Sequence, residues 1–256
     1  MSWVALLLLG VAVTDLVRSI WLVTIVPETV GAAVAVFAGL ACDLTRLGDV
    51  VALLGIAAVV IGWGQTAWRA TEPDPPTLPA WAPLLVLGGA LVVLLVCSVW
   101  AQPAAGVFGD WLDRAEVPVL SGMNATDALL AVAVVLVQLS TGNTFVRLVL
   151  LVTGTTNPGL RAGDQPSEQL RGGRLLGPME RVFIVGLGLA GHVTAASIVI
   201  AAKGLLRFPE LQAKATAVDG AKLTPTNIDK VTEYFLVGSF LSWLVALGSL
   251  VLLSGR

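Results

Sequence analysis

Charged side chains are scarce in this sequence: 12% of its 256 residues are Asp, Glu, Lys or Arg, whereas 56% are hydrophobic. Soluble domains carry about 25% charged residues, so a soluble protein of this length would lack the charge needed to cover its surface. The net charge of −2 and the absence of a basic patch argue against nucleic acid as a partner. The composition indicates an integral membrane protein whose main partner is the lipid bilayer.

Cysteine and histidine are equally rare. The two cysteines, Cys42 and Cys97, both lie in apolar segments, where a free thiol is commonly buried and inert. The one histidine is His192. Because the sequence has no Cys-x-x-Cys pair and no Cys/His cluster, it offers no ligand set for a structural metal, and we expect neither a metal nor a soluble cofactor.

What the sequence does contain is long apolar runs. A helix needs about 20 apolar residues to cross the hydrocarbon core of a bilayer. Residues 2–44 hold enough apolar residues for two spans, although charged residues and Pro27 interrupt them. We therefore predict an all-α polytopic membrane helix bundle of about seven spans, or six if 28–44 is re-entrant or interfacial. The five clear segments are 48–68, 80–101, 125–152, 180–203 and 231–253.

The connections suggest one transmembrane domain over 1–256 rather than separate folded domains. We expect the N-terminal spans in 1–153, a flexible Gly/Pro-rich loop over 154–177 and a C-terminal helical hairpin over 178–256 with a polar loop at 204–230. Residues 102–124 suggest a short interfacial helix around Trp111 and Leu112. Lys and Arg flank both ends of 180–203, so the positive-inside rule predicts no orientation. Five tryptophans mark expected membrane interfaces: Trp3, Trp21, Trp68, Trp81 and Trp100.

Small residues recur at three- and four-residue steps in the last two apolar segments. Such stripes let membrane helices approach closely, because packing replaces the hydrophobic driving force. We therefore predict that these segments pack as a tight hairpin. The glycines at 186, 188 and 191 also match a dinucleotide-binding pattern, but no soluble βαβ unit accompanies them. The stripes are Gly186, Ala190, Thr194, Ser197 and Ala201, then Ser239, Ser242, Ala246 and Ser249.

Four ionisable residues fall inside predicted spans, where each is a functional hypothesis by default. His192 suggests proton or substrate handling, or a hydrogen bond between helices. Asp15 and Arg18 are three residues apart and can pair within one helix, either as a structural ion pair or as the lining of a conduit. Arg147 follows the tetrad "STGN" at 140–143, which can break a helix as in discontinuous transporter helices.

The stretch "GGRLLGPMER" at 172–181 concentrates charge before an uncharged run. Pro178 suits the first turn of a helix, and Glu180 would then complement the positive helix end. This pattern predicts a helix start at the membrane interface. With other charges near the ends of the last two spans, we expect an interfacial cluster that holds the hairpin in register or receives an anionic head group. Its members are Arg174, Glu180, Arg181, Lys203, Arg207 and Glu233.

Three blocks carry a family resemblance: Gly173–Arg181, Ala201–Leu211 ("AAKGLLRFPEL") and Glu233–Leu247 ("EYFLVGSFLSWLVAL"). With them the C-terminal quarter resembles uncharacterised bacterial multi-span membrane proteins of the domain-of-unknown-function class. The resemblance implies a multi-pass protein of the bacterial cytoplasmic membrane. It implies no activity.

Three classes of function remain. The intramembrane charges and expected helix break favour a conduit for ions or small solutes. Tight small-residue faces favour a non-catalytic scaffold or sensor subunit that acts through a homo-oligomer or a membrane-protein partner. An intramembrane lipid enzyme would need a nucleophile, an acid–base pair or a metal set, and no spacing in the sequence suggests one. We expect a conduit, with the scaffold as the alternative and no catalytic residue.

Overall fold

The computed structural model describes residues 1–21, 25–71, 77–115, 122–155, 171–192, 194–202 and 225–254. For 171–175, 225–232 and 235 it describes the backbone alone. Every regular element in these ranges is a helix, as the composition predicts. The chain forms two compact units, unit 1 over Met1–Leu148 and unit 2 over Val149–Gly255.

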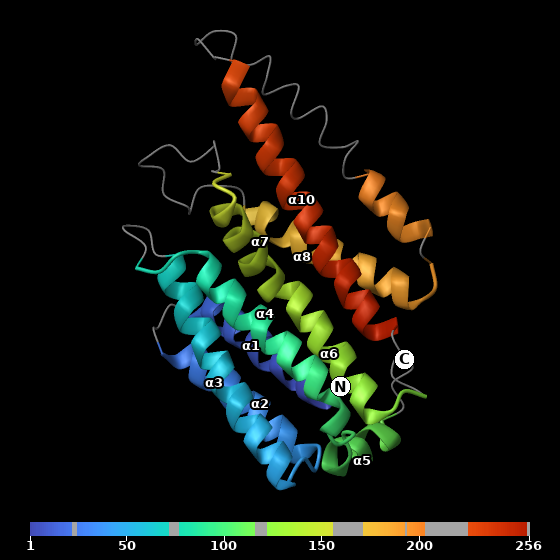
Figure 1. Ribbon diagram of the computed structural model, residues 1–256. Coiled ribbons are helices and arrows are strands. Elements are labelled where there is room, and N and C mark those ends of the chain that lie inside the picture. The colour runs from blue at the N-terminus through green and yellow to red at the C-terminus, as the bar shows by residue number, and fades with distance from the viewer. Residues whose placement is uncertain are drawn as a thin grey trace. The chain divides into compact units, whose positions relative to one another are not determined.

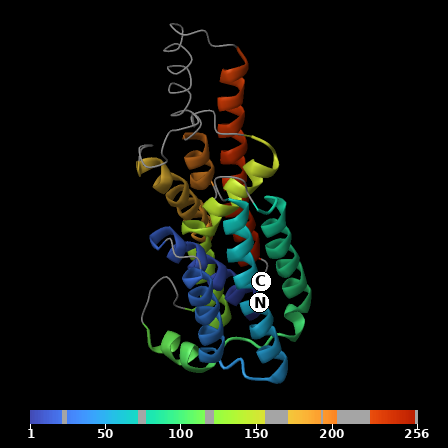
Figure 2. The same cartoon turned by 90° about the vertical axis from the view of Figure 1, so that its left-hand side faces the viewer.

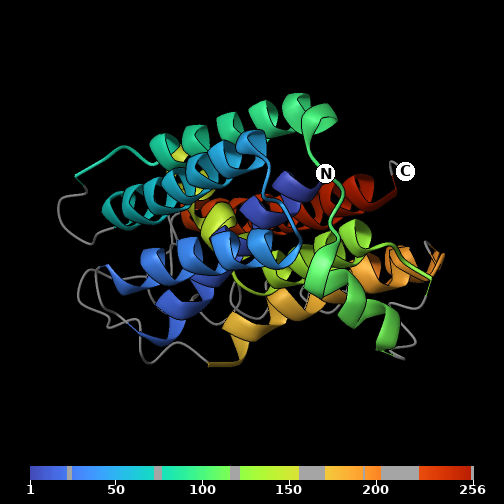
Figure 3. The ribbon, with the colours of Figure 1, turned by 90° about the horizontal axis from the view of Figure 1, so that it is seen from below.

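Unit 1 holds a bundle whose interior helix is α1. This helix contacts α2, α3 and α6, and it lies among these neighbours in Figures 1 and 3. α5 lies across one end of the bundle (Figure 2), where the Ala105 amide donates to the Cys42 carbonyl at 3.0 Å. The helices are α1 (Ser2–Ile20), α2 (Val26–Ala41), α3 (Leu47–Ala70), α4 (Trp81–Cys97) with η1 (Ser98–Trp100), α5 (Gly106–Arg114), α6 (Ala125–Leu139) and α7 (Thr141–Val152).

Glycines permit the close approach of α1, α2 and α3. A Cβ atom built on Gly31 of α2 would lie 2.0 Å from Thr14 Oγ1, and one on Gly64 of α3 would lie 2.3 Å from Glu28 Cγ. A Cβ on Gly10 of α1 would lie 2.8 Å from Val60 Cγ2. These three helices therefore pack backbone against side chain, as small residues allow in membrane bundles.

The expected helix break is confirmed. α6 ends at Leu139, α7 begins at Thr141, and the two helices are bent by 52°. The buried Ser140 hydroxyl donates to the carbonyls of Leu136 and Ala12, each at 2.9 Å. Ser140 thereby joins the bend to α1 at the level of Ala12.

Unit 2 differs from the predicted hairpin. Its helices are α8 (Arg171–Leu189), a helix over 194–202 and α10 (Pro225–Ser254). α8 packs on α10 with Glu180 beside Trp243 and Gly188 beside Leu250, so residue numbers rise together along both helices. The two helices therefore run parallel. The small-residue stripe of α10 is buried as expected, whereas Gly186 and Ala190 are exposed.

Two boundaries near α8 were predicted wrongly. Pro178 lies inside the helix rather than in its first turn, because α8 already begins at Arg171 within the expected loop. α8 ends at Leu189, and Gly191 adopts φ +78°, a conformation that glycine adopts at little steric cost. The expected continuous span over 180–203 is therefore interrupted. Likewise, α10 begins at Pro225, inside the expected polar loop.

Four of the described helices are long and apolar enough to cross a membrane: Ser2–Ile20, Leu47–Ala70, Trp81–Trp100 and Leu236–Ser254. The bent pair α6–α7 makes a fifth if it is counted as one span. α2 is apolar but has 16 residues. The chain is thus an all-helical protein with four or five helices suited to a membrane.

Candidate functional site

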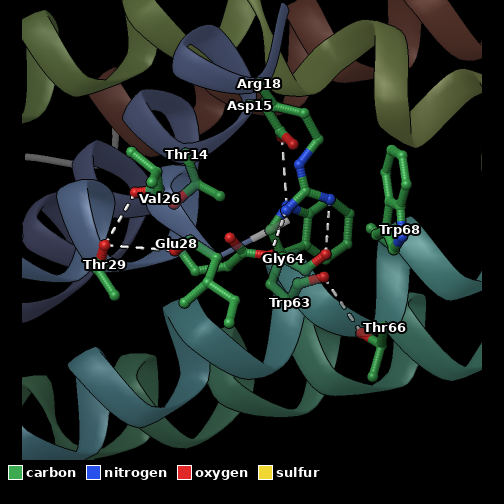
Figure 4. A network of polar contacts seen from close by, with 12 residues as sticks. Thr14, Asp15, Arg18, Val26, Glu28, Thr29, Trp63, Gly64, Thr66 and Trp68 are labelled. Carbon is green, nitrogen blue, oxygen red and sulfur yellow. Dashed lines mark hydrogen bonds and ion pairs between the residues drawn. The ribbon is translucent and has the colours of Figure 1, made fainter. Parts of the chain in front are cut away.

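Charged side chains meet inside unit 1, around the C-terminal half of α1. Arg18 forms an ion pair with Glu28 of α2 rather than with Asp15, the partner that the sequence predicted. The reason is geometric: Glu28 approaches the bundle interior where Gly64 leaves room for its Cγ. Figure 4 shows this group, which we call the Asp15 network: Asp15, Arg18, Glu28, Trp63, Gly64 and Trp68.

Three different contacts hold the Arg18 guanidinium. One Nη atom pairs with Glu28 Oε1, and the other donates to the Gly64 carbonyl at 2.7 Å. Arg18 Cζ also lies 5.6 Å from the centroid of a Trp68 ring, a cation–π arrangement. A carboxylate, a carbonyl and an aromatic face therefore compensate this cation on three sides.

Asp15 has uncharged hydrogen-bonding neighbours. The Trp63 indole donates to Asp15 Oδ2 at 3.2 Å. Thr141 and Thr144 of α7 lie near the same carboxyl group, although the buried Thr141 hydroxyl has no hydrogen-bond partner among the described residues. Thr141 is the first residue of α7, so Asp15 lies beside the positive end of that helix, directly after the bend. Asp15 thus connects α1 with α3 and with the broken helix.

Glu28 is the most deeply buried charged residue of the Asp15 network, with 1% of its surface exposed. Its Oε1 pairs with Arg18, but its Oε2 is buried and has no hydrogen-bond partner among the described residues. A buried acceptor without a donor costs free energy, and native proteins contain few of them. Among the described residues, no side chain or backbone donor satisfies Glu28 Oε2.

A second polar group lies at the opposite end of α1. The Trp3 indole donates to Asp49 Oδ1 at 2.8 Å. The Gln102 side chain fits when its nitrogen donates to Asp49 Oδ2 at 2.7 Å and its oxygen accepts from Arg46 Nε at 2.7 Å. We call Trp3, Arg46, Asp49 and Gln102 the Asp49 cluster. Trp3 is buried here.

Packed apolar residues separate the two polar groups. Asp15 follows Trp3 by twelve positions on α1, which is about 18 Å along a helix that rises about 1.5 Å per residue. Most apolar side chains of α1 in this interval are buried. The buried side chains include Val4, Leu6, Leu7 and Val11 of α1 and Leu53, Ile56 and Val60 of α3. The interior of unit 1 is therefore polar at both ends and apolar between them.

Two of the four predicted intramembrane residues lie outside the Asp15 network. Arg147 is exposed on α7, where it donates to the Thr71 carbonyl just after α3 at 3.4 Å. It therefore interacts with the negative end of α3. His192 is exposed between α8 and the helix over 194–202, not within a continuous span.

The predicted interfacial cluster is brought together only in part. Glu180 accepts a hydrogen bond from the Trp243 indole at 2.8 Å, and Arg181 donates to Ser242 Oγ at 3.1 Å. Both are buried against α10, away from the helix start where we expected them. Glu233 is exposed on α10, and the side chain of Arg174 is not described. Lys203 and Arg207 lie outside the described residues.

Sequence reasoning missed most partners of Asp15 and Arg18. Glu28 was read only as an interruption of an apolar segment, yet a carboxylate in such a segment needs a cationic partner. Trp63 lies well inside an expected span, where a buried indole N–H needs an acceptor. The predicted helix break points to Thr141 and Thr144 as residues of interest. It does not predict that they lie near Asp15.

Comparison with protein-family models, with curated proteins and with solved structures found no match to this chain. The described residues contain no group of three or more His, Cys, Asp or Glu side chains arranged to hold a metal ion.

Proposed function

We propose that the protein is a membrane conduit for ions or small solutes and that the Asp15 network is its binding site. The observation that carries this proposal is the position of a buried, incompletely satisfied charged network directly beside a broken helix. Ionisable residues inside a membrane bundle mark ion and substrate pathways. Transporters commonly build midplane sites from discontinuous helices whose ends face the bound ion or solute.

The apolar layer between the Asp15 network and the Asp49 cluster fits a conduit in a closed state. A solute reaching Asp15 from one side would meet this layer before the other side. Passage then requires a helix to move, and the bent α6–α7 segment is the element of unit 1 with a hinge already present. We place the protein in a bacterial cytoplasmic membrane with about seven spans, on the basis of its composition and the resemblance of its C-terminal blocks.

The alternative is a scaffold or sensor subunit that acts through a protein partner. The observation that favours it is the dry, close packing of α1, α2 and α3 around Gly10, Gly31 and Gly64. In that case the Asp15 network fixes the register of three helices, and charge pairs serve specificity rather than transport.

A flux assay distinguishes the two functions. Purified protein in liposomes is tested for movement of protons, monovalent cations and anions, using wild type, Glu28→Gln and the matched control Asp110→Asn. Asp110 is exposed on α5, far along the chain from the network, and pairs loosely with Arg114. We expect flux in wild type and in the control, and its loss in Glu28→Gln with folding intact.

Absence of flux for every ion in wild type would overturn the conduit and support the scaffold. Flux that survives Glu28→Gln and is abolished by His192→Ala would place the path in unit 2 instead. His192 is exposed and is not part of the Asp15 network. We therefore expect its substitution to leave flux unchanged.

A further inference from the structure

The Asp15 network contains two carboxyl groups and one guanidinium group. The side chains that face these groups from α3 and α7 are uncharged: Trp63 and Trp68 on α3, and Thr141 and Thr144 on α7. Arg147, the nearest cation in sequence on α7, is exposed and turned to Thr71. With both carboxyl groups ionised, the site would carry one uncompensated negative charge.

An uncompensated charge in a low-dielectric interior is costly, and a buried ionisable group avoids this cost by pairing or by changing protonation. Glu28 has the direct ion pair with Arg18, which stabilises its charged form. Asp15 has the guanidinium only as a more distant neighbour and is otherwise surrounded by hydrogen-bond donors. Charge balance therefore assigns a proton to Asp15 rather than to Glu28.

We propose that Asp15 is a proton-binding residue and that the conduit is coupled to protons. This inference rests on the proposed function and specifies its coupling ion. One proton moves from water to an Asp15 carboxylate oxygen and later returns to water, so no other reactant is required. Glu28 Oε2 is buried and has no partner in the described part of the chain, which is an independent sign that the site accepts a further donor.

The contacts of Asp15 explain how a proton would alter the fold. The carboxyl group accepts from Trp63 of α3 and lies near Thr141, the first residue of α7. A negative charge at the start of a helix is stabilised by the positive end of the helix dipole, so protonation of Asp15 weakens its attraction to the start of α7. By linkage, any movement of α7 away from Asp15 changes the affinity for the proton. Proton binding and the angle at Ser140 are thus coupled.

Infrared difference spectroscopy of the full chain in lipid tests this directly. The pH is stepped above about pH 6, where exposed carboxyl groups with ordinary pKa values near 4 stay ionised. We expect the carbonyl stretch of one protonated carboxyl group per protein as pH falls. In protein grown with ¹³C-labelled aspartate the band shifts, which assigns it to aspartate without any substitution. An unshifted band would assign the proton to a glutamate and overturn the proposal, as would the absence of any band.

Variants then identify the residue. Asp15→Asn should abolish the band, whereas the exposed control Asp110→Asn should retain it at full amplitude. If Asp15→Asn does not fold, Asp15→Glu keeps the carboxyl group and should return the band at the position of an unlabelled glutamate. A band unchanged by either Asp15 variant refutes the assignment. Because this measurement needs no transport, a protein that shows the band but no flux would refute the conduit and leave proton binding established.

Discussion

The substitution Gly64→Ala adds one methyl group at the closest contact between α3 and the Asp15 network. The new Cβ would lie 2.3 Å from Glu28 Cγ, 3.1 Å from Glu28 Cδ and 3.1 Å from Thr14 Cγ2. Ordinary carbon contacts are about 3.5–4.0 Å, so Glu28 must move by more than about 1 Å. Overpacking of this kind costs about 1–3 kcal/mol, and the movement also draws Glu28 away from Arg18.

Gly55→Ala is the matched control, because Gly55 lies on the same helix and its Cβ would meet nothing within 4 Å. A glycine-to-alanine change inside a helix stabilises it by roughly 0.5–1 kcal/mol through propensity alone. We therefore expect Gly64→Ala to lower, and Gly55→Ala to maintain or raise, the free energy of unfolding. The assay is reversible unfolding of purified protein in mixed micelles with increasing SDS, followed by far-ultraviolet circular dichroism.

The difference in the free energy of unfolding between Gly64→Ala and Gly55→Ala tests the close contact at Gly64. We expect Gly64→Ala to be less stable than Gly55→Ala by about 1–3 kcal/mol, the cost of overpacking alone, since the control removes the propensity term. Equal stabilities would show that α3 does not approach α2 at Gly64. The geometry of the Asp15 network would then be wrong, together with the functional reasoning built on it.

Three further predictions follow from the same contacts. Glu28→Gln or Arg18→Met alone should lower the free energy of unfolding by about 3–5 kcal/mol, because each leaves a buried partner unpaired; the double variant should lose less than the sum, and strict additivity would contradict the ion pair. Trp63→Phe should cost about 1–3 kcal/mol because it leaves a buried Asp15 oxygen without its donor, whereas Trp100→Phe, at an exposed position, should cost little. Cys42 is buried, with 1% of its surface exposed; maleimide should therefore leave Cys42 of the folded protein unmodified, Cys42→Ser should not change the labelling stoichiometry, and modification of both cysteines would contradict the burial.

The apolar helices could be predicted from the sequence because their signal is local. Length and hydropathy along 47–70 and 81–100 suffice to identify each helix. The bend at Ser140 was predictable for the same reason, since a short polar tetrad in an apolar run disturbs a helix wherever the run is placed. The short helix α5 was likewise expected around Trp111 and Leu112.

The pairing of charges was not predictable, because it depends on how helices align in space. Asp15 and Arg18 are neighbours on one helix face, so sequence spacing favours their pairing. The structure brings Glu28 closer because Gly31 and Gly64 let α2 sit against both α1 and α3. The choice between two partners three and ten residues away was thus made by glycines on other helices.

The predicted hairpin is not confirmed, and the reason is again an interruption that hydropathy does not reveal. Two consecutive apolar segments with a polar connection favour an antiparallel pair, but this inference assumes that each segment is one straight helix. Gly191 adopts a left-handed conformation, and α8 ends before the helix over 194–202 begins. Among the described residues, α8 packs on α10 with Glu180 beside Trp243 and Gly188 beside Leu250.

The two tryptophan–carboxylate contacts of unit 1 show why helix movement, rather than side-chain movement, must open any path. Trp3 of α1 donates to Asp49 of α3, and Trp63 of α3 donates to Asp15 of α1. These reciprocal bonds fix the parallel pair at two levels about 18 Å apart along α1, with close-packed apolar side chains between them. Sliding α1 along α3 would break both bonds together. Swinging α7 about the bend at Ser140 would leave both bonds intact and would instead disturb the Arg147–Thr71 hydrogen bond, the packing of Leu148 and the proximity of Thr141 to Asp15. A conduit built on this site would therefore open at the broken helix, where the movement would expose Asp15.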